Sequence, residues 1–97
     1  MDEREKVRSA IRELAGRRRN VTFSEIEWIV DRLRAYHTVV RKPGPHGFRF
    51  RIDGVRFGVC THHKGSRQIK PCYVDDFISA MIELGWYDED DDASQGH

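Results

Sequence analysis

Two alternating segments on either side of Asp53-Gly54 constrain the fold of this chain more than any other feature. Asp-Gly is a favoured two-residue type I′ turn, because both central positions of that turn need positive φ. A two-residue turn also fixes which residues face each other across the two strands. The three pairs predicted on one face are all apolar: Ile52 with Val55, Phe50 with Phe57, and Phe48 with Val59. We therefore predict a β-hairpin over residues 48–59 with one buried face.

The other face of this hairpin places Arg51 directly opposite Arg56. Like charges at opposed positions of an antiparallel pair reduce its stability. An anion that binds at this surface would explain why such a pair is present. Alternatively, two exposed arginine side chains simply point away from each other.

The hairpin lies in the most basic part of the chain, although the net charge of all 97 residues is only +1. Between residues 41 and 70, eight basic residues accompany a single acidic one, Asp53. A local field of this sign suits a polyanion, of which nucleic acid is the commonest in the cytoplasm. The alternative is that these cations only solvate an exposed sheet face.

Three segments have the apolar spacing of amphipathic helices. The first covers residues 4–15 and ends at Gly16. The second begins at Thr22, where Thr22-x-x-Glu25 fits a capping box, and ends near Ala35. The third covers residues 73–84 and ends at Gly85. Its predicted inward residues are Val74, Phe77, Ile78, Met81 and Ile82.

Two features near the first two helices each allow two interpretations. Arg17-Arg18-Arg19 reads as a solvated basic linker, with phosphate contact as the alternative. Trp28 falls off the apolar stripe of the second helix, and packing against the first helix is favoured over a contact with a partner. Between the second helix and the hairpin, residues 38–41 form a short strand that Pro43-Gly44-Pro45 should end. Residues 61–72 read as a polar loop.

The chain contains no run of about 18 apolar residues and begins without a signal-peptide pattern. Its two cysteines, Cys60 and Cys72, do not make a disulfide framework. We therefore expect one soluble α+β domain in the cytoplasm. The acidic tail over residues 88–97 is predicted to be disordered, with folding back over the basic hairpin as the alternative.

Extending the hairpin register outward places His46 opposite Thr61, within one or two residues of His62 and His63. Histidine titrates near neutrality and can exchange protons, while nearby cations stabilise a phosphate that gains charge. Such a group suits RNA cleavage by its own 2′-hydroxyl without a metal. A zinc site with the cysteines is disfavoured, because Cys60-x-His62 matches no common zinc spacing. No cofactor is expected, and unremarkable loop histidines are the alternative.

The order of motifs over residues 20–87 resembles the HicA family of toxin ribonucleases. The likeness includes Gly44-Pro45-His46-Gly47-Phe48 before the alternating strand, a His-Lys-Gly loop at 63–65, and Ile69-Lys70-Pro71 before the last helix. The resemblance implies an α-β-β-β-α fold like that of the double-stranded-RNA-binding domain, with helices on one face of a three-stranded antiparallel sheet. It also implies mRNA cleavage, a HicB-like antitoxin as partner, and His46 as the catalytic histidine. Residues 1–19 would be an N-terminal helical extension.

The leading hypothesis is a metal-independent endoribonuclease that acts on mRNA, with His46 as the general base and His62 or His63 as the general acid. A non-catalytic RNA-binding module and a domain that binds an acidic protein are the alternatives. The predicted RNA-binding residues are the eight cations of the basic region: Arg41, Lys42, Arg49, Arg51, Arg56, Lys64, Arg67 and Lys70.

Overall fold

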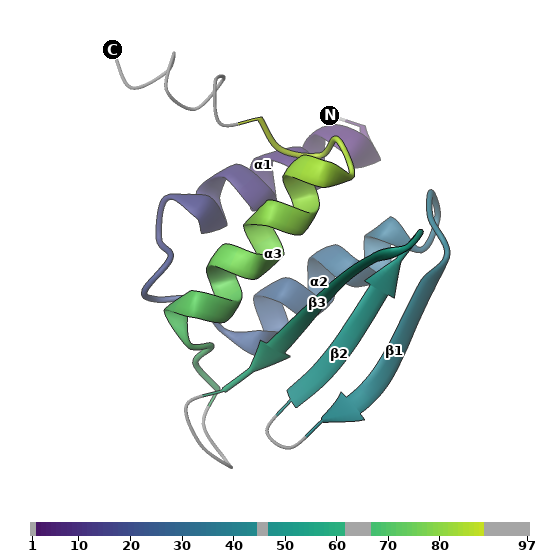
Figure 1. The fold of residues 1–97 in the computed structure, drawn as a ribbon. Coiled ribbons are helices and arrows are strands. Elements are labelled where there is room, and N and C mark those ends of the chain that lie inside the picture. Colours follow the sequence, from purple (N-terminus) through teal and green to yellow (C-terminus); the bar gives the residue numbers. More distant parts are fainter. Residues whose placement is uncertain (1, 45–46, 62–66, 89–97) are drawn as a thin grey trace.

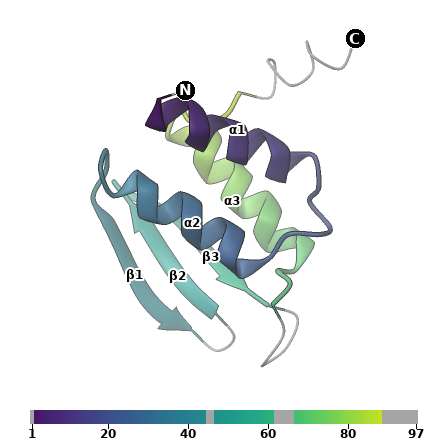
Figure 2. The same ribbon diagram turned by 180° about the vertical axis from the view of Figure 1, so that it is seen from behind.

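A computed structural model describes residues 2–44, 47–61 and 67–88. The elements follow in the order α1 (Glu3–Ala15), α2 (Phe23–Leu33), β1 (Val39–Gly44), β2 (Gly47–Ile52), β3 (Val55–Cys60) and α3 (Pro71–Glu83). The strands form one antiparallel sheet in the order β1-β2-β3. Figures 1 and 2 show the helices gathered on one side of this sheet. The predicted α+β class and the α-β-β-β-α order with an additional N-terminal helix are confirmed.

The β2–β3 hairpin has the predicted register. Phe50 faces Phe57, and Asp53 and Gly54 both have positive φ, at 47° and 90°, as a type I′ turn requires. The rings of Phe50 and Phe57 stack with centroids 5.3 Å apart, and the ring of Phe77 from α3 packs edge-on against Phe57. The buried face of the hairpin therefore packs against the helical layer.

The first strand is longer than predicted. The expectation that Pro43-Gly44-Pro45 ends it after Arg41 was wrong, because β1 continues to Gly44, where it pairs with Gly47. Proline is tolerated where its missing N–H would point away from the sheet, as it can on an edge strand. The sheet order makes β1 such a strand. Strands β1 and β2 thus also form a close hairpin, connected by residues 45–46.

The hydrogen bonds at the start of α2 differ from those predicted. Thr22 is the N-cap residue, but its side chain makes no capping hydrogen bond, so the predicted capping box was wrong. The Glu25 carboxylate instead accepts from Arg17 at 2.7 Å, and the backbone N–H of Phe23 donates to the carbonyl of Arg67 at 2.9 Å. Partners distant in the sequence thus replace the local cap. The helix ends at Leu33, two residues before the predicted end.

The connector after α1 is not a solvated linker. Arg17 pairs with Glu25, and Arg18 pairs with Asp75 of α3 at 2.9 Å. The apolar side of α1 joins the same hydrophobic core as the remaining elements, through Val7, Ile11 and Leu14 among others. The connector and α1 therefore fix the helices to one another.

Helix α3 begins at Pro71, two residues before the predicted start, which suits the preference of proline for the first helical turn. Ile82 was predicted to be buried but is 40% exposed, so that expectation was wrong. Gly85, with φ of 85°, turns the chain so that Trp86 and Tyr87 pack back onto the core.

The segment after β3 is more than a polar loop. Thr61 forms a bridge with the fully buried Ile69, and Gln68 forms another with Thr22, so the chain passes beside the start of α2. Trp28, 38% exposed, lines a shallow depression between α1 and α2, and the Arg32 guanidinium lies 4.1 Å from its ring centroid. The predicted tail beyond residue 88 lies outside the described residues. None of the described helices is long and apolar enough to cross a membrane.

Candidate nucleic-acid interface

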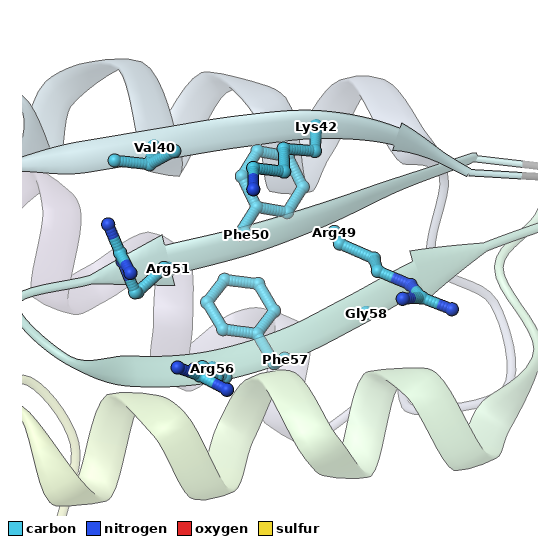
Figure 3. Close-up of a pocket in the computed structure, with 8 residues that line it drawn as sticks. All are labelled: Val40, Lys42, Arg49, Phe50, Arg51, Arg56, Phe57 and Gly58. Atoms are coloured by element: carbon cyan, nitrogen blue, oxygen red, sulfur yellow. The ribbon is translucent and has the colours of Figure 1, made fainter.

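The outward face of the sheet carries a cluster of cations. Because side chains alternate along a strand, burial of Phe50 and Phe57 turns their neighbours in β2 and β3 to the opposite face. The residues that line this face form a shallow depression of about 460 Å³ (Figure 3). Its four cations are Lys42, Arg49, Arg51 and Arg56, and we call them the open-face cations. Among the residues that the structure describes, no acidic side chain lines the depression.

Within residues 2–44, 47–61 and 67–88, the side chains of the open-face cations make no ion pair or hydrogen bond, whereas other cations of the molecule do. The ion pairs of this part of the chain lie among the helices and the connector, together with the pair that joins Arg41, on the helical side of β1, to Glu27 of α2. The positive charge of the open face is therefore not neutralised by described carboxylates.

Arg51 and Arg56 are directly opposed, as the sequence register predicts. Figure 3 shows the Arg51 side chain leaning toward β1 and the Arg56 side chain at the β3 edge beside α3. Their divergence reduces the repulsion and leaves both guanidinium groups open to solvent. Both alternatives considered for this pair, anion binding and mutual avoidance, are compatible with this arrangement.

The only acidic residue of the basic region is engaged elsewhere. The two carboxylate oxygens of Asp53 bind the backbone N–H of Thr38 at 3.0 Å and Nδ1 of His37 at 2.6 Å. The hydrogen bond from His37, followed by that from Thr38, lowers the pKa of Asp53 below its ordinary value of 3.8. The carboxylate is thus held at the turn, where it pairs with His37 and not with an open-face cation.

Arg41 is not one of the open-face cations, although it was predicted with them. It pairs in register with Phe50, which places it on the helical side of β1. Its guanidinium binds the Glu27 carboxylate of α2 at 3.1 Å and lies 4.4 Å from the ring centroid of Phe48. Its charge is therefore already paired.

Two further predicted RNA-binding residues lie beyond the sheet. Lys70 is exposed, and its backbone N–H donates to the carbonyl of Cys60 at 3.2 Å, which puts it beside the end of β3. Arg67 is also exposed, and its carbonyl accepts from the backbone N–H of Phe23, so this residue lies beside the start of α2. Both residues belong to the segment that follows Cys60, the last residue of β3. This end of β3 is the one farther from the Asp53 turn.

The predicted catalytic histidines and Lys64 lie outside the described residues. His46 immediately precedes Gly47, and His62 and His63 follow Thr61. The last described pair of the hairpin ladder is Gly47 with Cys60. The predicted approach of His46 to His62 and His63 stays a prediction.

Gly47 lies where two strands come unusually close. A Cβ at this position would clash with the carbonyl oxygen of Val59 and lie 2.9 Å from Cα of Cys60. A Cβ at Gly58, on the same face, would meet only the Tyr73 ring at 3.8 Å. The backbone of the open face therefore requires glycine at position 47 and has room for a small side chain at position 58.

The cysteines do not form part of a described metal site. In the described stretches of the chain, no group of three histidine, cysteine or acidic side chains could hold a metal ion. Cys60 and Cys72 are both free thiols. A hydrogen bond with Cys60 is the largest contribution to a raised pKa of the Tyr73 phenol.

Sequence reasoning missed one chain of polar contacts, between His37, Asp53 and Trp86, which is partly exposed. The indole Nε1–H of Trp86 donates to Nε2 of His37 at 2.8 Å. An indole N–H can only donate, so Nε2 accepts, and the His37 proton lies on Nδ1 and is donated to Asp53. This chain of hydrogen bonds ties the hairpin turn to the segment after α3. No local pattern signals it, because the three residues are far apart in the sequence.

The chain matches no protein-family model, and comparisons with curated proteins and with solved structures found no significant match. The functional assignment therefore depends on the residues and the geometry of this chain.

Chemically, the open face can hold anions. A guanidinium presents a planar fork of donors that matches two oxygens of a phosphate, and an ammonium group adds a compact charge. Four such groups around one shallow depression produce a positive potential, and the nearest described carboxylate, Asp53, lines the adjoining depression with Arg51 and Arg56 and is hydrogen-bonded to His37 and Thr38. The shallow shape suits an extended polyanion that crosses the sheet better than a small molecule that needs enclosure.

Proposed function

We propose that this protein binds RNA through its open-face cations and cleaves it as a metal-independent endoribonuclease of the HicA toxin type. One observation carries the binding part. The four cations on the outward sheet face have no ion pair among the described residues, although the same chain pairs Arg17, Arg18 and Arg41 with carboxylates. Unpaired cations gathered on one open face are the electrostatic footprint of a nucleic-acid interface.

The composition of this face favours RNA over an acidic protein as the partner. Protein interfaces usually bury aromatic or other large apolar side chains at their centre. The depression instead presents its cations around Val40 and Gly58, and the Phe50 and Phe57 side chains are directed into the core. A phosphate backbone needs cations and does not need an apolar anchor.

The cleavage part of the proposal depends on histidine chemistry at the end of the sheet. His46 would take the proton of the ribose 2′-hydroxyl, whose oxygen then attacks the adjacent phosphorus atom. The bond from phosphorus to the 5′-oxygen breaks, and His63 or His62 would protonate that oxygen. The products are a 2′,3′-cyclic phosphate and a 5′-hydroxyl. The cations would stabilise the charge that develops on the phosphate oxygens.

Two features of the chain support this placement. His46 is bonded to Gly47, which is the first residue of β2 and lies two residues before Arg49 of the open face. The ladder between β1 and β2 continues to the pair Gly44 with Gly47, the residues on either side of positions 45 and 46. As a toxin of this type, the protein would act on mRNA in the cytoplasm and be neutralised by a HicB-like antitoxin. Its partner would have to cover or compete for the open face.

The test is an incubation of purified protein with RNA in excess EDTA, resolved on a denaturing gel. We expect cleavage that EDTA does not prevent, and loss of cleavage in the variant His46→Ala. Circular dichroism must show that this variant is folded, and its RNA affinity must be retained. Cleavage that persists in folded His46→Ala would reject His46 as the base.

The same experiment separates the alternatives. RNA binding without any cleavage would identify a non-catalytic RNA-binding module. If the protein fails to bind RNA even at low salt, the RNA-binding proposal itself is wrong and a protein partner for the basic face becomes the better explanation.

A further inference from the structure

The three described strands present no aromatic side chain on the open face, and the aromatic ring beside this face is that of Tyr73 from α3, next to Gly58 at the β3 edge. The aromatic residues of the described strands, Phe48, Phe50 and Phe57, lie on the helical side of the sheet. Phe48 packs against Phe23 of α2 with centroids 5.4 Å apart, and Phe50 and Phe57 are nearly inaccessible to solvent. Sheets that bind single-stranded RNA by base stacking expose such rings on their open face. This sheet has them on the opposite face.

The open face also lacks most of the groups that read base edges. Amide, hydroxyl and carboxylate side chains distinguish bases by hydrogen bonding. The outward positions of the three described strands carry Val40, Lys42, Gly44, Gly47, Arg49, Arg51, Arg56, Gly58 and Cys60. Apart from the thiol of Cys60, the polar side chains in this set are the four cations. Of the direct base contacts common in proteins, only pairing of arginine or lysine with guanine is left to them.

The cations are arranged in two rows across the sheet. The strand register aligns Lys42, Arg49 and Gly58 in one row. It aligns Val40, Arg51 and Arg56 in the next row toward the turn. Rows on the same face are two residues apart along a strand, or about 7 Å. This separation is comparable to that of successive phosphates along a nucleic-acid strand, so each row can hold one phosphate with two cations.

Gly58 leaves space for a phosphate in the first row. Figure 3 shows the Arg49 side chain extended toward Gly58, and the nearest neighbour of a Cβ at Gly58 would be the Tyr73 ring, at 3.8 Å. Glycine in a strand often marks a position where a ligand comes close to the backbone. The close fit at Gly47 explains that glycine sterically, whereas a Cβ at Gly58 would make only ordinary contact. Steric crowding thus does not account for Gly58.

From these observations we infer that the open face recognises the phosphate backbone alone, so that the protein binds nucleic acid with little regard to base or sugar. The inference rests on the proposed function and specifies its substrate recognition. Single-stranded DNA would bind about as well as RNA. It would resist cleavage, because it lacks the 2′-oxygen that must attack phosphorus. Selectivity for RNA would then arise in the chemical step and not in binding.

The test compares uncleavable oligonucleotides of one length by fluorescence anisotropy at one low salt concentration. The probes are 2′-O-methyl RNA 12-mers of uridine, adenosine or cytidine, a mixed 12-mer containing guanosine, and a DNA 12-mer of the same mixed sequence. We expect dissociation constants that agree within about threefold. The DNA 12-mer should also inhibit cleavage of RNA at a concentration near its own dissociation constant, while it remains intact.

A preference of more than tenfold for one base, including guanine, or for the 2′-O-methyl RNA over DNA would overturn the inference and leave the proposed RNA binding in place. Absence of binding to every probe would overturn both. If all probes bind equally but RNA is not cut, the inference stands and only the nuclease activity is rejected.

Discussion

The two faces of the sheet differ in whether a neighbouring basic side chain of β1 has an acidic partner. Arg41 and Lys42 are neighbours in β1, yet Arg41 turns toward the helices and pairs with Glu27, whereas Lys42 turns outward and has no described partner. The helical face combines apolar packing with paired charge. The outward face collects charge without pairing it. The proposed binding of an anionic ligand would use the cations that are gathered on the outward face without a carboxylate in the lining of their depression.

The difference also separates stability from function. Burial of apolar side chains supplies most of the free energy of folding, and exposed charges contribute little. The opposed Arg51 and Arg56 even reduce stability. The comparison therefore predicts that substitutions on the helical face affect folding and those on the outward face affect binding.

The largest expected effect comes from two adjacent residues of β3 that lie on opposite faces. Phe57→Ala removes a ring that packs between Phe50 and Phe77, and we expect a loss of about 3–5 kcal/mol in the free energy of unfolding. The control Arg56→Ala should change it by no more than about 0.5 kcal/mol. Urea denaturation followed by circular dichroism measures both. Equal losses would contradict the assignment of the two faces.

The next effect concerns the two glycines of the open face. Gly47→Ala puts a methyl group against the carbonyl oxygen of Val59, and we expect a loss of about 1–3 kcal/mol in the free energy of unfolding, since the backbone must shift. Gly58→Ala adds the same group where only an ordinary contact with Tyr73 awaits it, and stability should be unchanged or slightly higher. The same denaturation measurement applies, and a reversed order of the two variants would be inconsistent with the close strand approach at Gly47.

A smaller effect is expected from pH at the turn. The pKa of Asp53 is lowered in the folded protein, so its ionised form favours folding. This contribution is complete above the ordinary value of 3.8 and is lost as the pH falls through the lower folded value. The variant Asp53→Asn keeps a residue that tolerates positive φ but cannot ionise. The melting temperatures of the two proteins should therefore converge as the pH falls from about 5 downward. A constant difference over that range would contradict the role of the carboxylate.

The smallest effect is expected at the opposed arginines. Arg51→Gln removes the repulsion with Arg56, and the free energy of unfolding should rise by a few tenths of a kcal/mol at low salt. Because salt screens the repulsion, the gain should shrink as sodium chloride is added. Denaturant titrations at two salt concentrations measure it, and destabilisation by the same substitution would indicate a structural role for Arg51.

Features set by local chemistry could be predicted from the sequence, and features set by distant contacts could not. Asp53-Gly54 determines its own turn, so the register from Ile52–Val55 to Phe48–Val59 is correct. The predicted capping box was wrong, because the Glu25 carboxylate pairs with Arg17, a residue outside the helix. The length of β1 depends on its place at the sheet edge, which the sequence does not show. Strand alternation and the hairpin register put Arg49, Arg51 and Arg56 on the outward face. The assignment of Lys42 to the outward face and of Arg41 to the helical face needed the pairing of β1, which is longer than expected.

The most direct test of the central claim is the RNA affinity of Arg49→Gln/Arg56→Gln beside a control that removes two cations from the helical side, Lys6→Gln/Arg19→Gln. Each cation that no longer neutralises a phosphate of a single strand reduces the slope of log affinity against log salt by about 0.7, so the open-face variant should show a slope smaller by about 1.4. It should also bind at least tenfold more weakly at low salt, while the control retains the affinity and slope of the unmodified protein to within about twofold and 0.3. Equal weakening by both variants would mean that RNA responds only to net charge, and the open face would not be the binding site.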